Sequence, residues 1–502
     1  MSTEFILAVD QGTSGTKAVV FDTAGAVVAK ATEPLASQFP RPGFVEQDPL
    51  EVYENARAAV RKCLTAFQAT TASGLDTIVT CGISNQRETF VLWDESGTPL
   101  CNAIVWQCKR SVDICSRLRG TELESQIKQR TGLIVDPYFS GTKLLWLREN
   151  TPDLAAAIRA GRAWFGTVDT WLLYKLTGGT QYLTDHTNAS RTLLFNLDAL
   201  DWDRHLLTEY GLDGLKLPGV QPSSSQFGAT DFDGLLPKPI PISAMIGDSH
   251  AAAFGERCFA SGTAKATLGT GCSILLNTGS KKVASHAGMV TTICWSTPER
   301  IDYALEGIIV ACGATIDWLR DSLGLFADSA QTAEMALSLE DNAGVYLVPA
   351  FSGLGAPHWK MDLRAAALGL TLGCNKSHIV RAALESIPYQ IKDVIVAMED
   401  ESGVGLEQLN VDGGITGNEF VMRFLADLLA TEVVNIGLAD VSALGAALLA
   451  GLHEGVFEDI ARLQQLITKT QVYAPRSDAQ GVRMAYEGWK RAVQTLVMSS
   501  SQ

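Results

Sequence analysis

Two segments, one in each half of the chain, share the pattern of a strand, a short turn rich in glycine and threonine, and a second strand. The first covers residues 5–22, with its turn at residues 12–17 (GTSGTK), and the second covers residues 264–277, with its turn at residues 269–271 (GTG). Such a recurrence indicates two related lobes. The length of 502 residues agrees, because single cores rarely grow beyond about 250–300 residues.

Around these hairpins, strands and helices alternate in the manner of an α/β fold. Residues 26–29 extend the first hairpin into a three-stranded meander, and residues 77–83 form an apolar run typical of a buried strand. Residues 52–67 carry apolar side chains at helical spacing. Residues 441–452 are apolar and rich in alanine but too short to span a bilayer, so we interpret them as a buried helix.

A third glycine turn lies late in the chain, at residues 412–414 (DGG), and an amphipathic helix is predicted from about residue 418 to residue 430. The proline-rich residues 218–243 form an irregular connection in the middle of the chain. We therefore place the domain boundary just after this connection, which predicts an N-terminal domain of residues 1–252 and a C-terminal domain of residues 253–502.

Composition argues against several classes of function. The formal net charge is −15 and no basic stripe is present, so we do not expect a nucleic-acid partner. The sequence has neither a secretory signal nor a run of about 18 apolar residues, so we expect a cytoplasmic protein without a membrane span. The 10 cysteines form no Cys-x-x-Cys pair and are expected to be reduced, mostly buried thiols.

The glycine turns offer backbone N–H groups and hydroxyls that can hold phosphate oxygens. The first turn lacks the spacing of a P-loop, and alone it could be an ordinary hairpin. Asp10, just before this turn, favours the functional interpretation, because a carboxylate at a strand end beside a phosphate turn can hold Mg²⁺. Two such turns in matching positions of two lobes indicate a pair of phosphate clamps.

A second group of polar and aromatic residues suits a polyol. Arg87 and Glu88 follow a predicted strand and could recognise vicinal hydroxyls, although a solvated surface ion pair is the ordinary alternative. Trp106 and Tyr138 could form the apolar wall of such a site or pack in a core. Asp248 lies between an apolar segment and a run of alanines, where it is either a helix cap or a general base.

Many long segments together resemble the FGGY carbohydrate kinases, and within them the glycerol kinase branch. Residues 138–150 (YFSGTKLLWLREN) resemble the first family signature, and residues 365–370 with residues 378–385 resemble the second. In the second signature, Ala367 stands where a larger apolar residue is usual. The resemblance extends from residue 5 to about residue 490. It includes residues 85–89, 103–108, 136–143, 166–171, 187–191, 347–359 and 412–414.

The resemblance implies an α/β fold of two actin-like, RNase-H-like ATPase lobes with an interlobe active-site cleft. It also implies ATP-dependent phosphorylation of a small polyol, first of all glycerol to glycerol 3-phosphate, with ATP and Mg²⁺ as cofactors and a homodimer or homotetramer as the assembly. The implied acceptor contacts are Arg87, Glu88, Trp106, Tyr138, Asp248, Ser249 and Ser273, with Asp248 as the catalytic base. The implied nucleotide contacts are Thr13, Ser14, Lys17, Thr270, Gly313, Gly414 and Asn418, with Asp10 beside the metal.

Two positions depart from the pattern of the glycerol kinase branch. Ser249 stands where that branch carries Gln, and Ser273 stands where it carries Phe. Both changes put a small polar side chain in place of a large one, which predicts a roomier acceptor pocket. Residues 232–238 (FDGLLPK) also lack the glycine-rich loop with an arginine that binds fructose 1,6-bisphosphate in enterobacterial members, so we do not expect feedback by that sugar.

Two other hypotheses stay open from the sequence. A non-catalytic actin-like nucleotide switch would use the same phosphate turns, but it would leave Arg87, Glu88 and Asp248 without a role. A kinase for a C4 or C5 polyol or a ketose, such as erythritol, threitol or erythrulose, would use the same chemistry in a larger pocket. ATP turnover with and without added polyols distinguishes the switch from the kinases.

Overall fold

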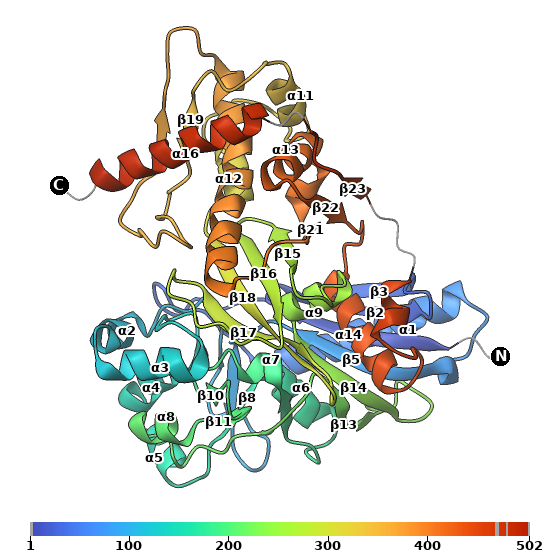
Figure 1. The fold of residues 1–502 in the computed structure, drawn as a ribbon. Helices are drawn as coiled ribbons and strands as arrows, with labels where there is room; N and C mark the ends of the chain where they lie inside the picture. Colours follow the sequence, from blue (N-terminus) through green and yellow to red (C-terminus); the bar gives the residue numbers. More distant parts are fainter. Residues whose placement is uncertain (1–3, 467–470, 478–479, 500–502) are drawn as a thin grey trace. The chain divides into compact units, whose positions relative to one another are not determined.

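The computed structural model describes residues 4–466, 471–477 and 480–499, and the chain divides into two compact units (Figure 1). The division after Arg257 lies close to the boundary expected at residue 252, but two later segments belong to the first unit. The expected contiguous domains 1–252 and 253–502 therefore need adjustment. Unit 1 comprises Met1–Arg257, Thr291–Tyr303 and Asp440–Thr468, and unit 2 comprises Cys258–Val290, Ala304–Ala439 and Lys469–Gln502.

A six-stranded sheet with the order β13-β14-β5-β1-β2-β3 forms the centre of unit 1. The first three strands of the chain form the predicted antiparallel meander, in which Asp10 lies opposite Lys17. β5 runs parallel to both β1 and β14, so the carboxyl ends of these three strands meet at one edge of the sheet. The strands are β1 (Phe5–Gly12), β2 (Gly15–Asp22), β3 (Val27–Pro34), β5 (Ile78–Asn85), β13 (Ser224–Thr230) and β14 (Ile240–Gly247).

Different helices cover the two faces of this sheet, because successive side chains of a strand point to opposite faces. Leu7 and Val9 of β1 share a core with α1 (Pro49–Thr70), which confirms the predicted helix at residues 52–67. Gly82 of β5 instead leaves room for the backbone of α14 (Val441–His453) at Ala446. The helix α14 is buried along most of its length, as predicted, and its contacts with β5 and β1 explain why this late segment belongs to unit 1.

Smaller elements complete unit 1. A second sheet has the order β4-β7-β6-β8, and two strand pairs are formed by β9 with β12 and by β10 with β11. The strands of this second sheet and of the two pairs are β4 (Glu46–Gln47), β6 (Phe90–Trp93), β7 (Ala103–Ile104), β8 (Trp164–Thr167), β9 (Leu183–Asp185), β10 (Phe195–Asn196), β11 (Asp201–Trp202) and β12 (Gly219–Gln221). The other helices of unit 1 are η1 (Leu75–Thr77), α2 (Val112–Leu118), α3 (Glu122–Thr131), α4 (Ser140–Asn150), α5 (Pro152–Arg159), α6 (Val168–Leu176), α7 (His186–Ala189), α8 (Arg204–Glu209), α9 (Asp248–Gly255) and α15 (Ile460–Gln464).

Unit 2 has a sheet of its own, in which β18, β16, β15, β21, β22 and β23 follow one another in space. The second predicted hairpin is confirmed as the antiparallel pair of β15 and β16, and β21 runs parallel to β15. The division between the units passes through β17 and β18. The strands that lie wholly in unit 2 are β15 (Thr263–Leu268), β16 (Cys272–Gly279), β19 (Tyr346–Val348), β20 (Ala366–Leu368), β21 (Gln408–Asp412), β22 (Glu432–Asn435) and β23 (Gln471–Tyr473). Those that the division crosses are β17 (Val290–Ser296) and β18 (Ile301–Ile309).

The helices of unit 2 surround a core that includes the side chains of α12 and α13. The predicted helix near residues 418–430 is α13, whose first turn is capped by the Asn418 side chain. Among the described residues, none of the helices combines the length and the apolar character that a membrane crossing requires. The helices are α10 (Gly313–Asp321), α11 (Gln331–Leu337), α12 (Lys376–Ser402), η2 (Gly414–Gly417), α13 (Glu419–Leu429) and α16 (Gln480–Ser499).

The contact between α14 and α9 depends on a glycine. Gly445 lies against the backbone of Ala251, where a Cβ would overlap the Ala251 carbonyl. The substitution Gly445→Ala should therefore lower the free energy of unfolding by about 1–3 kcal/mol, the usual range for overpacking. Urea unfolding followed by circular dichroism measures this change. Gly405→Ala is the matched control, since nothing lies within 4 Å of its added Cβ, and equal midpoints for the two variants would contradict a close α9–α14 contact.

Candidate functional site

The candidate site in unit 1 lies at the sheet edge where the carboxyl ends of β1, β5 and β14 meet. Gly12 ends β1, Asn85 ends β5 and Gly247 ends β14, and Asn85 pairs in register with both Gln11 and Gly247. Polar segments follow each of these ends, namely the turn after β1, residues 86–89 after β5, and the start of α9 after β14. In open sheets with parallel strands, this edge is the usual place for a binding site.

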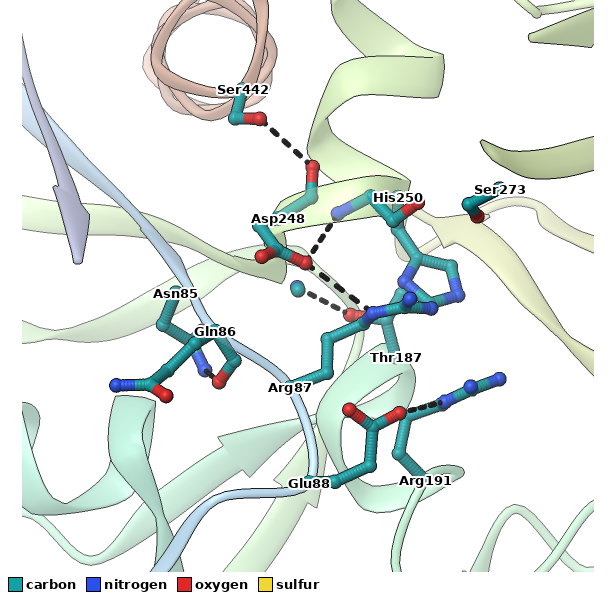
Figure 2. A network of polar contacts seen from close by, with 12 residues as sticks. Asn85, Gln86, Arg87, Glu88, Thr187, Arg191, Asp248, His250, Ser273 and Ser442 are labelled. Carbon is teal, nitrogen blue, oxygen red and sulfur yellow. Dashed lines mark hydrogen bonds and ion pairs between the residues drawn. The ribbon is translucent and has the colours of Figure 1, made fainter. Parts of the chain in front are cut away.

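Asp248 is an accessible carboxylate that a buried arginine holds in place. It is the first residue of α9, and its Oδ1 lies 3.3 Å from Arg87 Nε and accepts a hydrogen bond of 2.6 Å from the Ser249 N–H (Figure 2). The Asp248 side chain is 40% exposed, whereas that of Arg87 is 6% exposed. The N-cap of α9 is Gly247, so Asp248 is not the helix cap, and its carboxylate is open to a ligand.

Glu88 is buried and bonded to residues far away in the sequence. Its Oε1 accepts a hydrogen bond of 2.6 Å from Arg191 Nε, and both side chains are at most 1% exposed (Figure 2). The backbone of Glu88 has φ 61°, a left-handed conformation that costs a non-glycine residue about 1–3 kcal/mol. Ser140 Oγ fixes this conformation by donating to the Glu88 carbonyl at 2.7 Å. The idea of a solvated Arg87–Glu88 surface pair is therefore wrong.

Two aromatic rings stand beside these charges and connect to the first glycine turn. Trp106 and Tyr138 meet edge to face, with ring centroids 5.5 Å apart. The Trp106 indole Nε1–H donates to Thr13 Oγ1 at 2.8 Å, and the Trp106 backbone N–H donates to Thr89 Oγ1 at 3.1 Å. This pair of aromatic rings is thus fixed directly to the expected phosphate turn.

The buried side chain of Gln86 connects the first glycine turn to the segment that follows β5. Gln86 Oε1 accepts from Thr89 Oγ1 at 2.9 Å and from Thr13 Oγ1 at 3.4 Å, and its Nε2 donates to Gln47 and to Gln11. Gln86 and Arg191 are not among the expected site residues, although both fall within segments that resemble the family pattern. Their roles depend on partners distant in sequence, which no local pattern reveals.

Asp10 lies near two other carboxylates, those of Asp248 and Asp440. Burial, together with the nearby Asp248 carboxylate, raises the pKa of Asp10 to about 6, although Lys17 and a hydrogen bond from Ser84 act in the opposite direction. Lys17 Nζ is 3.1 Å from Asp440 Oδ1. Although burial acts to raise it, hydrogen bonds from Lys17 and Lys30 hold the pKa of Asp440 below its usual value. A divalent cation beside Asp10 would offset the repulsion between these carboxylates.

No cluster of three or more metal-binding side chains is found in the described part of the chain. Mg²⁺ in phosphotransferases is usually held by one or two carboxylates together with phosphate oxygens and water. Asp10, at the end of β1, could supply one such carboxylate.

The candidate nucleotide residues of unit 2 gather at one end of its sheet. Gly313 N–H donates to the Gly269 carbonyl at 2.9 Å, and the Thr270 carbonyl accepts from Ala314 N–H at 3.1 Å, so α10 begins directly beside the second glycine turn. β15 and β21 are parallel, and Gly413, which follows β21 with φ 94°, lies against the backbone at the end of β15.

The other expected residues of unit 2 lie nearby in the chain. Gly414 opens η2 and is exposed, while Asn418 caps α13 and donates from Nδ2 to Thr332 Oγ1 at 3.0 Å. Ser273 lies in β16, where its Oγ donates to the buried Glu306 carboxylate at 3.2 Å. In unit 1, Ser14 lies exposed at the tip of the first turn.

Comparison with known proteins agrees with this arrangement. Residues 5–255 match the N-terminal domain of the FGGY family of carbohydrate kinases, and residues 264–453 match its C-terminal domain. A glycerol kinase of Shewanella oneidensis is 45% identical over 98% of this chain and 99% of its own length. A glycerol kinase of Symbiobacterium thermophilum is 44% identical over 98% of each chain.

Solved structures give the same result. A crystal structure of Plasmodium falciparum glycerol kinase with ADP superimposes with a TM-score of 0.93 at 34% identity and covers 98% of each chain. A xylulose kinase from Lactobacillus acidophilus shares the fold, with a TM-score of 0.88 at 21% identity over 99% of each chain. With both domain matches and a full-length relative at 45% identity, the chain belongs to the FGGY family of carbohydrate kinases.

Proposed function

We propose that this protein transfers the γ-phosphoryl group of ATP to a primary hydroxyl of glycerol, giving glycerol 3-phosphate and ADP. The observation that carries the proposal is the arrangement of Arg87, Asp248 and the Trp106–Tyr138 surface at the sheet edge that also bears the first glycine turn. Full-length similarity to glycerol kinases at 44–45% identity supports glycerol as the acceptor.

The residues present suit a small polyol. One side of such a ligand is a row of hydroxyls, each of which donates and accepts, and the other side is a short C–H surface. Arg87 donates and Asp248 accepts, while the rings of Trp106 and Tyr138 suit the C–H surface. The enclosed Glu88 carboxylate, paired with Arg191, holds the loop that carries Arg87 in place. These groups are fixed before a ligand binds, which lowers the entropic cost of positioning it.

The proposed reaction is an in-line transfer with Asp248 as the base. Asp248 accepts the proton of the attacking hydroxyl while a bond forms from that oxygen to the γ-phosphorus and the bond to the ADP oxygen breaks. Arg87 keeps the carboxylate oriented toward the acceptor. The hydroxyls and backbone N–H groups of Thr13 and Ser14, together with Lys17, bind phosphate oxygens, and so do Thr270 and Gly313, whereas Gly414 and Asn418 border the adenosine.

Asp10 would hold Mg²⁺ directly or through its water, with Asp248 near enough to add to the negative potential. When bound with ATP, Mg²⁺ supplies positive charge that offsets the charge on the phosphate oxygens. The alternative of a non-catalytic nucleotide switch accounts for the glycine turns but gives no reason for an accessible carboxylate beside a buried arginine and two aromatic rings.

The substitution Asp248→Asn tests the assignment of the base. The variant should fold normally, because Asp248 caps no helix, and should lose about 10²–10⁴-fold in kcat, the usual effect of removing a positioned base. A coupled assay of ADP release with glycerol measures kcat, and circular dichroism checks the fold. Turnover close to the wild-type value would rule out Asp248 as the base.

The hydrogen bond from the Trp106 indole N–H to Thr13 Oγ1 should couple the aromatic rings of the proposed acceptor site to the efficiency with which ATP is used. The substitution Trp106→Phe keeps an aromatic face but removes the indole N–H, so kcat/KM for ATP should fall by about 2–10-fold, the equivalent of one net hydrogen bond. Thr13→Val removes the other partner of this bond. In a double-mutant cycle the two losses should not add, and fully additive effects would show that the bond has no such role.

Ser249 and Ser273 favour a second candidate function, the phosphorylation of an acceptor larger than glycerol. Both are small and polar at positions where the glycerol kinase branch carries Gln and Phe, and both are half-buried here. The family resemblance assigns both serines to the acceptor, and these smaller side chains would leave room for a fourth carbon and its hydroxyl. A space bordered by hydroxyls would hold ordered water when a three-carbon ligand is bound.

We therefore expect erythritol, threitol or a C4 ketose to be phosphorylated with a kcat/KM within about tenfold of that for glycerol, a difference of ~1.4 kcal/mol. The double substitution Ser249→Gln with Ser273→Phe should shift the preference toward glycerol. A panel of polyols and ketoses in the ADP-release assay measures both effects. Efficient use of glycerol together with rejection of every four-carbon compound would disprove the enlarged pocket.

A further inference from the structure

The helix α4 contains a lysine that neither the glycine turns nor the acceptor contacts account for. Lys143 is 0% exposed, and its ammonium donates to three backbone carbonyls, those of Val105 at 3.2 Å, Trp106 at 3.3 Å and Tyr138 at 3.0 Å. An ammonium has three donors, so these three carbonyls satisfy it completely. Two of the carbonyls belong to Trp106 and Tyr138, whose rings form the aromatic wall of the proposed acceptor site.

These bonds join two separate segments. Val105 and Trp106 follow β7, whereas Tyr138 lies just before α4, and Lys143 lies one helical turn inside α4. The neighbouring Ser140 of the same helix donates to the Glu88 carbonyl at 2.7 Å. One helical turn therefore holds the backbones of Glu88, Trp106 and Tyr138 in a fixed relation, although neither Ser140 nor Lys143 needs to touch a ligand.

We propose that Lys143 is a positioning residue for the acceptor, whose charged ammonium holds the Trp106 and Tyr138 backbones at the spacing that a small polyol requires. This inference rests on the proposed acceptor role of these two aromatic residues. A neutral amine has only two N–H donors, and its lone pair would face the third carbonyl, so loss of the proton should loosen one of the two segments.

The surroundings make this proton unusually easy to lose. Burial lowers the pKa of Lys143 to about 7, although Glu88 and Cys108 act to raise it, and Lys109 and Arg110 add to the lowering. The ammonium form thus predominates below pH 7 and the neutral form above it. The KM for the acceptor should therefore rise as the pH increases from 7 to 9, while at a fixed saturating acceptor concentration the KM for ATP should change less.

The substitution Lys143→Met provides the first test, because methionine is of similar length but has no donor. We expect the KM for glycerol to rise by about tenfold, with kcat and the KM for ATP changed by less than about threefold. Lys238→Met is the matched control, since Lys238 is exposed, is not among the groups that shift the pKa of Lys143 and should leave all three constants unchanged. A glycerol KM in Lys143→Met equal to that of the control would overturn the proposal.

The pH profile of the wild-type enzyme provides a second test that needs no substitution. We expect the glycerol KM at pH 9 to be at least about threefold higher than at pH 7, whereas Lys143→Arg, which stays charged, should show a flat profile. A flat wild-type profile overturns the proposal even if Lys143→Met fails to fold. Failure of the proposed function has a different signature, since the wild-type enzyme would then show no turnover that depends on a polyol.

Discussion

The buried ion pair between Glu88 and Arg191 is the interaction on which the proposed acceptor site most depends. Glu88 has a left-handed backbone and a fully enclosed carboxylate, two features that are each unfavourable in isolation. Arg191 compensates the charge and Ser140 fixes the carbonyl, so the loop after β5 has one stable shape. Removing one partner of such a pair typically costs ~3–5 kcal/mol, because the other charge stays buried without compensation.

The topology of the unit 1 sheet explains why these groups meet. β5 lies between β1 and β14 and runs parallel to both, so three segments far apart in sequence end at one edge. Polar side chains concentrate where the ladders stop, because backbone groups there need other partners. At this edge Gln86 and Trp106 form hydrogen bonds with Thr13 of the first glycine turn, and Lys143 donates to the backbone carbonyls of Trp106 and Tyr138.

Ion pairs between residues far apart in the sequence also stabilise the first hairpin. Asp440, just before α14, pairs with both Lys17 and Lys30, more than 400 residues earlier in the sequence. The same helix covers the face of the sheet opposite α1, and Ser442 at its start donates to the Asp248 carbonyl. A late segment thus completes the unit that bears the proposed acceptor residues, and it contacts both the first hairpin and Asp248, the proposed base.

The sequence alone determined the local structure and the family. Glycine turns and alternating apolar residues predicted both hairpins, α1, α13 and α14, because strand period, helix period and turn geometry are local properties. Resemblance named Arg87, Glu88 and Asp248 as candidates. Only the tertiary structure decided that Glu88 pairs with Arg191, that Lys143 supports Trp106 and Tyr138, and that residues 440–468 join unit 1. Those choices depend on burial, because a charge removed from water must find its partner in space, wherever that partner lies in the sequence.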